Sequence, residues 1–169
     1  MKAIKVVLFA LALVSSIYSA VVNAEESMDD HSLILLVGPA MEKSTVDGSK
    51  AYGTALAFEF TAIEHQLEIE LGTQYLSTSN PKELGAQIIF KKPFELAQDV
   101  ELGVGLGPAI WRKTSSPGNS LQSGVAFVAD FMFWTTKKLG WYLSPSYAYG
   151  TSGGADRSAG VSVGLLFSM

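Results

Sequence analysis

Residues 158–168 read Ser-Ala-Gly-Val-Ser-Val-Gly-Leu-Leu-Phe-Ser, with Ala159, Val161, Val163, Leu165 and Phe167 at every second position. The positions between them are mostly small. Successive side chains of a β-strand point to opposite faces, so this two-residue period predicts a strand with one apolar face rather than a helix.

The same alternation continues through most of the chain. We predict eight strands, over residues 33–41, 51–61, 66–76, 83–92, 99–112, 121–135, 140–150 and 158–168. At a rise of ~3.3 Å per residue and a tilt of ~40°, ten residues climb ~25 Å, which is the height of the apolar band of an outer-membrane barrel.

The apolar parity of these segments contains no charged residue. One Lys or Arg facing the middle of a membrane would cost about 2–4 kcal/mol, so the exclusion is what lipid imposes. Aromatic residues fall at both ends of this face, as two interfacial girdles would; they are Phe60, Phe90, Phe133, Trp141 and Phe167 at the inner end, and Tyr52, Tyr75 and Tyr149 at the outer end. We therefore predict an all-β fold, an eight-stranded antiparallel up-and-down transmembrane β-barrel.

Two details of the strands stay open at this stage. Residues 33–41 are apolar on both faces, so the register of the first strand is not determined. Pro108 and Pro145 lie on the outward parity inside strands, where each removes a backbone donor, and they predict a bulge or a locally weak strand pair.

The N-terminus has the order of a secretory signal peptide. Lys2 and Lys5 precede an apolar run, and small residues lead to Ala24. The run is shorter than the ~20 residues that span a bilayer. We expect residues 1–24 to be a signal peptide and residues 25–169 to be a single β-barrel domain in the outer membrane of a Gram-negative envelope.

Composition excludes several classes of function. Residues 25–169 retain ten of the twelve basic residues and all sixteen acidic ones, a formal charge of −6 that makes nucleic acid an unsuitable partner. The chain has no cysteine, so it contains neither a disulfide nor a thiolate metal site.

The connections between the predicted strands alternate in character. Those after the second, fourth and sixth segments (residues 63–65, 93–98 and 136–138) are short, whereas residues 42–50, 77–82, 113–120 and 151–157 are richer in Ser, Thr, Gly, Pro and Asn. A barrel with both termini in the periplasm has tight turns on the inner side and longer loops outside.

The inward parity carries a polar cluster in the periplasmic half of the lumen, formed by Glu59, Glu68, Glu70, Lys91, Glu101 and Asp130. Five carboxylates around one ammonium are costly to keep ionised in a narrow lumen. We expect them to form an internal ion-pair plug in which some hold a proton or recruit Lys138, water or a cation. A proton-linked or cation-binding site is the alternative.

The outer half of the inward face is dominated by glycine and alanine. Ordinary side chains fill an eight-stranded barrel, so these small residues predict an outward-opening vestibule decorated by Gln74, Gln87, Trp111 and Gln122. The alternative is that the glycines let the strands coil tightly.

Catalytic motifs are absent from the sequence. His31 and His65 are the two histidines, both are placed at the periplasmic end, and there is no Gly-x-Ser-x-Gly element. The Gly103-Val104-Gly105-Leu106-Gly107 stretch resembles a phosphate loop but precedes no helix. We expect no enzymatic activity, no cofactor and no metal.

The predicted outer loops carry basic residues that could meet phosphates of lipopolysaccharide; they are Lys43, Lys50, Lys82, Arg112, Lys113 and Arg157, against the acids Glu42, Asp47, Glu83 and Asp156. Outer-membrane lipids are therefore the expected partners, with lipopolysaccharide and an unidentified small molecule as candidates.

The strand pattern, together with Gly107-Pro108-Ala109-Ile110-Trp111 and residues 140–147, resembles the small eight-stranded outer-membrane barrels that include the membrane domain of outer-membrane protein A. That resemblance implies a non-enzymatic barrel with a structural, surface-contact or ligand-binding role. A narrow, porin-like channel for small solutes or ions is the first alternative. A lipid-modifying enzyme is the second, although the chain has no histidine beyond residue 65. A soluble lipocalin-like barrel would need an apolar interior instead.

Overall fold

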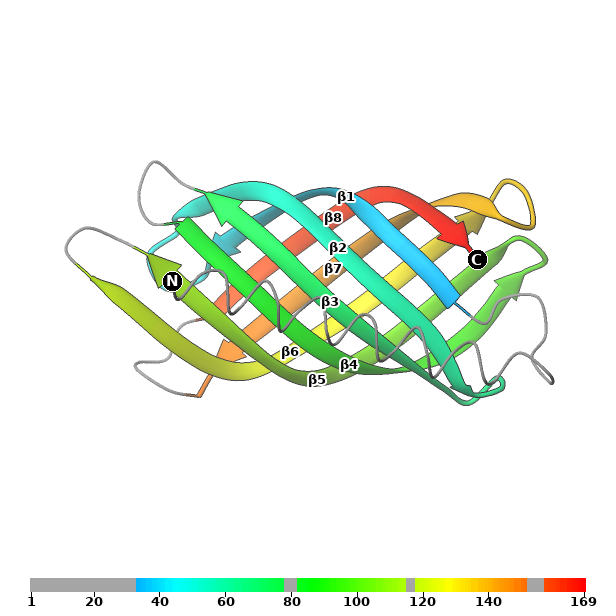
Figure 1. The fold of residues 1–169 in the computed structure, drawn as a ribbon, viewed down its shortest axis with the longest axis horizontal. Coiled ribbons are helices and arrows are strands. Elements are labelled where there is room, and N and C mark those ends of the chain that lie inside the picture. Colours follow the sequence, from blue (N-terminus) through cyan, green and yellow to red (C-terminus); the bar gives the residue numbers. More distant parts are fainter. Residues whose placement is uncertain (1–32, 78–81, 115–117, 152–156) are drawn as a thin grey trace, which may run out of the picture. The chain divides into compact units, whose positions relative to one another are not determined.

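The computed structural model describes residues 33–77, 82–114, 118–151 and 157–169; the predicted signal peptide lies outside them. Eight strands make up this part of the chain (Figure 1): β1 (Leu33–Ser44), β2 (Lys50–Ile63), β3 (Leu67–Ser77), β4 (Lys82–Ala97), β5 (Val100–Thr114), β6 (Asn119–Trp134), β7 (Leu139–Gly150) and β8 (Arg157–Ser168). No helix among the described residues is long and apolar enough to cross a membrane.

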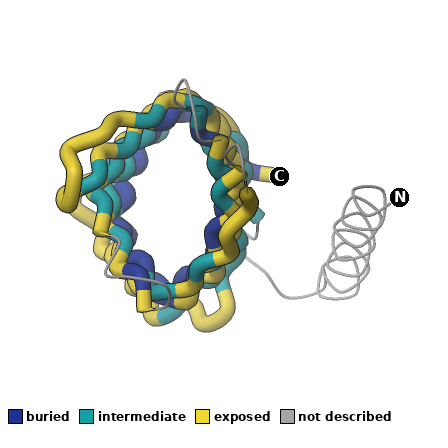
Figure 2. Tube along the Cα trace, turned by 90° about the vertical axis from the view of Figure 1, so that its left-hand side faces the viewer, coloured by how far each residue is buried: buried dark blue, intermediate teal, exposed yellow. Residues whose placement is uncertain are grey.

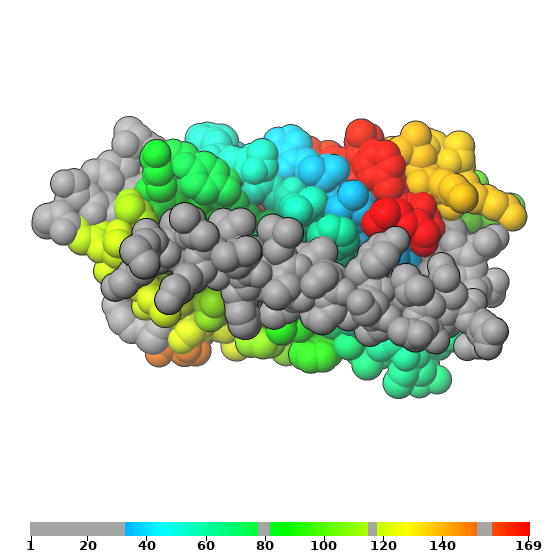
Figure 3. Space-filling view, viewed as in Figure 1, coloured from blue at the N-terminus to red at the C-terminus, as the bar shows by residue number. Residues whose placement is uncertain are grey.

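The strands form one closed antiparallel barrel in chain order. Each strand pairs with the next, and β8 pairs with β1, where Leu35 lies opposite Phe167 and Met41 opposite Val161. In Figure 3 the red atoms of β8 accordingly lie beside the blue atoms of β1. The predicted fold class is confirmed.

The strand registers determine the stagger of the barrel. From Leu33, successive partners around the barrel lead through Phe60 on β2 and Phe90 on β4 and return to β1 at Lys43, ten residues further along the strand. For eight strands this stagger corresponds to a tilt of ~40°. The tilt matches the value that the sequence argument needed to span the apolar band.

The two faces of the wall separate as the alternation predicts (Figure 2). Tyr52, Leu84, Leu106 and Leu165 are exposed on the outside, whereas the inward positions are largely buried. The structure also determines the face of β1, because Ile34 and Leu36 are buried inside while Val37 and Met41 are exposed. The sequence alone left this register open.

β4 is longer than predicted. It continues to Ala97, so most of the expected turn at residues 93–98 is strand, and the connection to β5 is short. The prediction that the outward face carries no charge is wrong at two positions, because Lys92 and Arg112, the last residues of the predicted strands 83–92 and 99–112, are exposed on it. The Lys92 ammonium lies 5.5 Å from the ring centroid of Phe94 near the inner end of the strand, where a long side chain can reach the interface.

The in-strand prolines weaken pairing without shifting it. Pairing between β6 and β7 stops at Val128–Ser146 and resumes at Phe131–Leu143 in the same register, which leaves Pro145 unpaired on that side. Pairing between β4 and β5 is likewise interrupted beside Pro108, and that between β8 and β1 beside Pro39. Of the two predicted outcomes, an interrupted pair rather than a bulge is therefore found at Pro39, Pro108 and Pro145, whereas Pro93 stays paired with Gly103.

Candidate functional site in the barrel lumen

The inner half of the lumen is filled by apolar side chains. Ile34, Leu36, Met132, Tyr142 and Leu166 form one buried cluster, and Met132 and Leu166 are completely inaccessible to solvent. These residues come from β1, β6, β7 and β8, on one side of the barrel. The charged residues of this half lie on the opposite strands β2 to β5, except for Asp130 on β6.

Lys91 is the centre of the charged group. Its Nζ donates to Glu59 Oε2, to Glu70 Oε2 at 3.0 Å and to Asp130 Oδ2 at 2.7 Å. We call these four residues the Lys91 cluster. Its members belong to β2, β3, β4 and β6, and all four are buried, Lys91 with 1 % of its surface exposed. The ammonium thus links strands that are not all neighbours in the wall.

Two glycines of β5 let the Lys91 side chain reach β6. Gly105 is the register partner of Lys91, and Gly103 is the partner of Asp130. A Cβ on Gly105 would overlap Cγ of Lys91, whereas one on Gly103 would meet Cδ at an ordinary 3.4 Å. Lys91 therefore runs along a strip of β5 that carries no side chains.

The other two predicted members of the polar cluster lie outside this centre. Glu68 is buried and its carboxyl group contacts that of Glu101, nearer the inner end of the barrel. Glu68 Oε2 and Glu59 Oε1 are buried oxygens without a hydrogen-bond partner among the described residues. Lys138 is exposed in the turn between β6 and β7 and is not a partner of the Lys91 cluster.

The carboxylates of the Lys91 cluster are close enough to be considered as metal ligands. One oxygen each from Glu59, Glu70 and Asp130 lies within 4.8 Å of the others. However, Lys91 Nζ donates to an oxygen of each carboxylate, so a cation of the protein itself already neutralises part of their charge. The geometry is that of an ion-pair centre.

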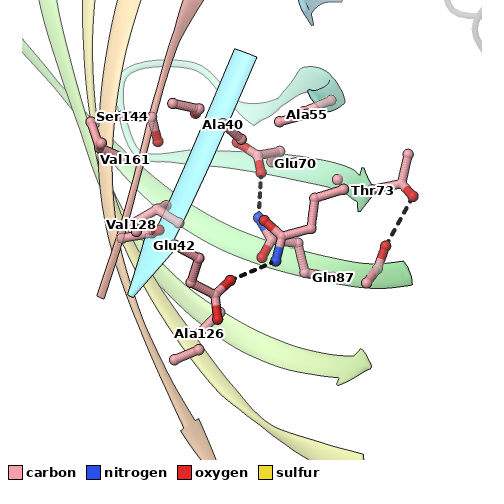
Figure 4. Close-up of a pocket in the computed structure, with 18 of the residues that line it drawn as sticks. Ala40, Glu42, Ala55, Glu70, Thr73, Gln87, Ala126, Val128, Ser144 and Val161 are labelled. Atoms are coloured by element: carbon pink, nitrogen blue, oxygen red, sulfur yellow. Dashed lines mark hydrogen bonds between the residues drawn. The ribbon is translucent and has the colours of Figure 1, made fainter. Parts of the chain in front are cut away.

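Above the Lys91 cluster the lumen opens into a cavity (Figure 4). The cavity is narrow, since the centre of a water molecule can reach a volume of about 70 Å³ inside it. Glu70 and Asp130 lie at its floor, and its wall includes Gln74, Gln87 and Trp111. A second, shallower cavity with Trp111 and Gln122 adjoins it toward the loops, since both share Glu42, Trp111, Ala148 and Ser158. We call this combined space the vestibule.

Hydrogen bonds connect the wall of the vestibule to its floor and to its rim. Gln87 Nε2 donates to Glu70 Oε1 at 3.1 Å, and Gln74 Nε2 donates to Glu42 Oε2 at 3.2 Å (Figure 4). Sequence reasoning missed Glu42 as a lumen residue because it ended the first strand at residue 41 and assigned Glu42 to the outer loop, whereas β1 runs to Ser44. It also missed the serines of the opposite wall, Ser144, Ser146, Ser158 and Ser162, whose signal was their inward parity on β7 and β8.

The lumen glycines have two different roles. A Cβ on Gly72 would crowd Gln87, and one on Gly85 would lie 3.1 Å from the Trp111 ring, so these glycines make room for larger neighbours. At Gly107 and Gly124 a Cβ would meet the backbone of the adjacent strand, which indicates tightly coiled strands. The explanation by tight coiling fits Gly107 and Gly124, whereas Gly72 and Gly85 accommodate the side chains of Gln87 and Trp111.

The histidine that the structure describes lies far from the vestibule. His65 is exposed in the turn between β2 and β3, with a φ of 55°, and its Nε2 lies 3.3 Å from Glu64 Oε1. Nδ1 lies 3.5 Å from Glu95 Oε1. His31 falls outside the described residues. The vestibule within those residues consequently contains no imidazole to activate a serine.

Comparison with known proteins identifies the fold. No protein-family model and no curated protein sequence matches the chain. Among solved structures, Neisserial surface protein A aligns with a TM-score of 0.68 at 13 % identity, over 85 % of this chain and 100 % of its own.

Two further structures align over nearly their whole length. The N-terminal β-barrel domain of Pseudomonas aeruginosa OprF has a TM-score of 0.59 at 14 % identity and covers 81 % of this chain and 98 % of its own. The attachment invasion locus protein Ail of Yersinia pestis has a TM-score of 0.55 at 13 % identity, over 82 % and 99 %. The chain therefore has the fold of the small eight-stranded outer-membrane β-barrels.

Proposed function

We propose that the protein is a non-enzymatic, non-conducting outer-membrane barrel that acts at the outer surface, through its rim and through a small polar molecule held in the vestibule. The observation that carries this proposal is the unequal filling of the lumen. The outer half holds open space, whereas the Lys91 cluster and the apolar cluster occupy the inner half.

This filling argues against the alternative of a narrow channel. An ion that entered from outside would reach Glu70 and Asp130 and would then have to pass a closed group of buried ion pairs and apolar side chains. Protein interiors packed at this density leave little space for water. The cluster would have to break for conduction to occur.

The chemistry of the vestibule wall favours a small ligand that is neutral or cationic. Its polar groups are amides, serine hydroxyls and the carboxylate of Glu42, and its floor holds more carboxylates than ammonium groups. A lumen with low-dielectric walls focuses such a field and favours cations over anions. Trp111 adds an apolar surface beside these hydrogen-bonding groups.

Single-channel recording in planar bilayers tests this function. The wild-type barrel should show no stepwise current, and Glu70→Gln or Asp130→Asn, which weaken the bonds of Lys91, should be the variants most able to create one. Glu42→Gln is the matched control, because it changes a carboxylate of the rim without contacting Lys91. Steady current through the wild-type protein that changes in Glu68→Gln or Glu70→Gln would favour the channel instead.

The alternative that the protein is a lipid-modifying enzyme needs a separate experiment. Mass spectra of outer-membrane lipids should be the same in cells with and without the protein, and Ser→Ala variants at Ser144, Ser146 and Ser158 should leave them unchanged. A lipid product that depends on one of these serines would contradict the non-enzymatic proposal.

A further inference from the structure

At the vestibule end of the barrel, most basic residues of the strands face outward and the acidic residues face inward. Five of them lie at strand ends on the same parity as the exposed apolar residues; they are Lys43, Lys50, Lys82, Arg112 and Arg157. The acids of the same strand ends, Glu42 and Glu83, point inward, and Lys113 Nζ lies 3.6 Å from Glu83 Oε2. Among the described strand residues at this end, every outward-facing charge is therefore positive.

Three of these five residues gather across the seam of the barrel. Lys43 on β1 lies directly opposite Lys50 on β2, and Arg157 begins β8, which pairs with the other edge of β1. The backbone N–H of Thr45 donates to the carbonyl oxygen of Arg157 at 2.7 Å, which joins the ends of these strands. We call Lys43, Lys50 and Arg157 the seam cluster.

The charges of the seam cluster are not balanced within the described part of the chain. No carboxylate there lies within ion-pair distance of Lys43, Lys50 or Arg157. Like charges directly opposite each other in an antiparallel pair are destabilising. An external anion would turn this repulsion into attraction.

The turn between β1 and β2 holds Lys43 and Lys50 opposite each other. The Ser44 N–H donates to the Ser49 carbonyl oxygen at 2.9 Å, and Gly48 adopts a φ of 74° that favours glycine. Asp47 accepts bonds from Ser49 N at 3.0 Å and from Ser49 Oγ at 2.8 Å. This carboxylate is therefore engaged within the turn, and Lys43 and Lys50 are held in register.

The position of the seam cluster indicates what kind of anion it meets. Tyr52 and Tyr149 lie next to it on the outward face, and tyrosine belts mark the level of lipid headgroups. The Arg157 guanidinium lies 5.1 Å from the Tyr149 ring centroid. The cluster thus stands just beyond the apolar band and points away from the lumen.

We propose that the seam cluster binds the phosphate groups of a lipid headgroup in the outer leaflet. This proposal rests on the proposed function, since it requires the vestibule end to face outward. Lys and Arg bind phosphate through charge-assisted hydrogen bonds, and three cations on adjacent strands can hold a headgroup that carries more than one phosphate. A lipid is favoured over a soluble anion because the side chains project on the lipid-facing side.

The test uses the barrel in detergent micelles and measures binding of diphosphorylated lipid A against the same lipid after phosphatase treatment. Wild-type protein should prefer the phosphorylated lipid, and Lys43→Gln with Lys50→Gln should weaken that binding roughly tenfold or more, because each basic residue near an anionic surface contributes measurably. The control is Lys137→Gln with Lys138→Gln, which removes the same charge at the opposite end of the barrel.

A second variant separates binding from folding. Lys50→Glu places an opposite charge across from Lys43, so it should preserve or raise the resistance of the barrel to heat while lipid binding falls. Heat-modifiable migration on a gel reports folding for every variant. Reduced binding in a fully folded Lys50→Glu protein would support the phosphate site.

Three results would overturn the inference. They are equal affinity for phosphorylated and dephosphorylated lipid, an equal loss in the Lys137/Lys138 control, and equally tight binding of soluble polyphosphate, which would indicate a free anion as ligand. A conducting barrel that still binds the phosphorylated lipid through Lys43 and Lys50 would contradict the proposed function and leave the lipid site standing.

Discussion

The inner and outer halves of the lumen are built from the same strands, but the inner half is filled by side chains and the outer half is open. In the inner half the ion pairs of Lys91 and the side chains around Met132 fill the space. In the outer half, small residues and serines leave a cavity that is open at one end. The difference shows that the wall of a barrel fixes its diameter, whereas inward side chains determine where it is closed.

The two halves also compensate their carboxylates differently. The carboxylates of the Lys91 cluster receive an ammonium, whereas Glu42 near the rim receives an amide N–H from Gln74. An unpaired buried charge is far more costly than one near water. The predictions below test how far this contrast holds, beginning with the largest expected effect.

Lys91→Met should lower the free energy of unfolding by about 3–5 kcal/mol, because it leaves Glu59, Glu70 and Asp130 buried together without their cation. Urea unfolding in lipid vesicles measures this. Lys113→Met is the matched control in the outer half; its partly exposed pair with Glu83 should account for at most about 1 kcal/mol. Equal decreases in the free energy of unfolding of the two variants would contradict the proposed difference between the inner and outer halves.

Changes in side-chain volume should also have opposite effects in the two halves. Met132→Ala creates a cavity at a completely buried position and should cost about 2–5 kcal/mol. Ala55→Leu adds volume to the wall of the open vestibule and should cost less than about 1 kcal/mol. The same unfolding assay measures both, and a large loss for Ala55→Leu would mean that the outer half is packed.

The strip of β5 beneath Lys91 gives a sharper test at neighbouring positions. Gly105→Ala should destabilise the barrel by about 1–3 kcal/mol, since the new methyl group would overlap Cγ of Lys91 and the carbonyl oxygen of Phe90. Gly103→Ala should be nearly neutral, because its methyl group would make an ordinary contact at 3.4 Å. Thermal midpoints of the heat-modifiable band compare them, and the reverse order would contradict the path of the Lys91 side chain.

The smallest effect is expected at Asp47, in the turn beyond the vestibule. Hydrogen bonds from Ser44 and Ser49 lower the pKa of Asp47 from 3.8 to about 2. A depressed carboxyl pKa contributes stability above pH 4, and this contribution is lost as the pH falls toward 2. NMR titration should place the transition near pH 2, and Ser44→Ala should move it upward; an unchanged transition in that variant would rule out Ser44 as the cause.

Sequence periodicity predicted the architecture because lipid imposes a strict rule on the outward face. The first and last residues of each predicted strand differ from the observed ones by at most three positions, except at the end of β4, which runs to Ala97. The predicted strand ended at Lys92 because residues 93–98, which begin with Pro93, were assigned to a short inner connection. In the structure Lys91 points into the cluster, Lys92 lies outside near Phe94, and Pro93 remains within the strand.

The site was less accessible to sequence reasoning. Parity predicted Glu59, Glu70, Lys91 and Asp130 on the inward face together with Glu68 and Glu101. It could not separate the two groups, because the distance between residues across a barrel depends on its stagger. The outer basic residues were counted together with the acids. Applying parity to those strand ends as well would have separated outward Lys43 from inward Glu42.

The three interrupted strand pairs beside Pro39, Pro108 and Pro145 have a consequence for how the barrel exchanges with solvent. One of them lies in the seam between the first and last strands and divides it into two shorter runs of paired residues. Amide protons along this seam should therefore exchange with deuterium sooner than those of the uninterrupted β5–β6 pair. The line along which the chain closes into a cylinder is thus one of the three lines along which backbone pairing is interrupted.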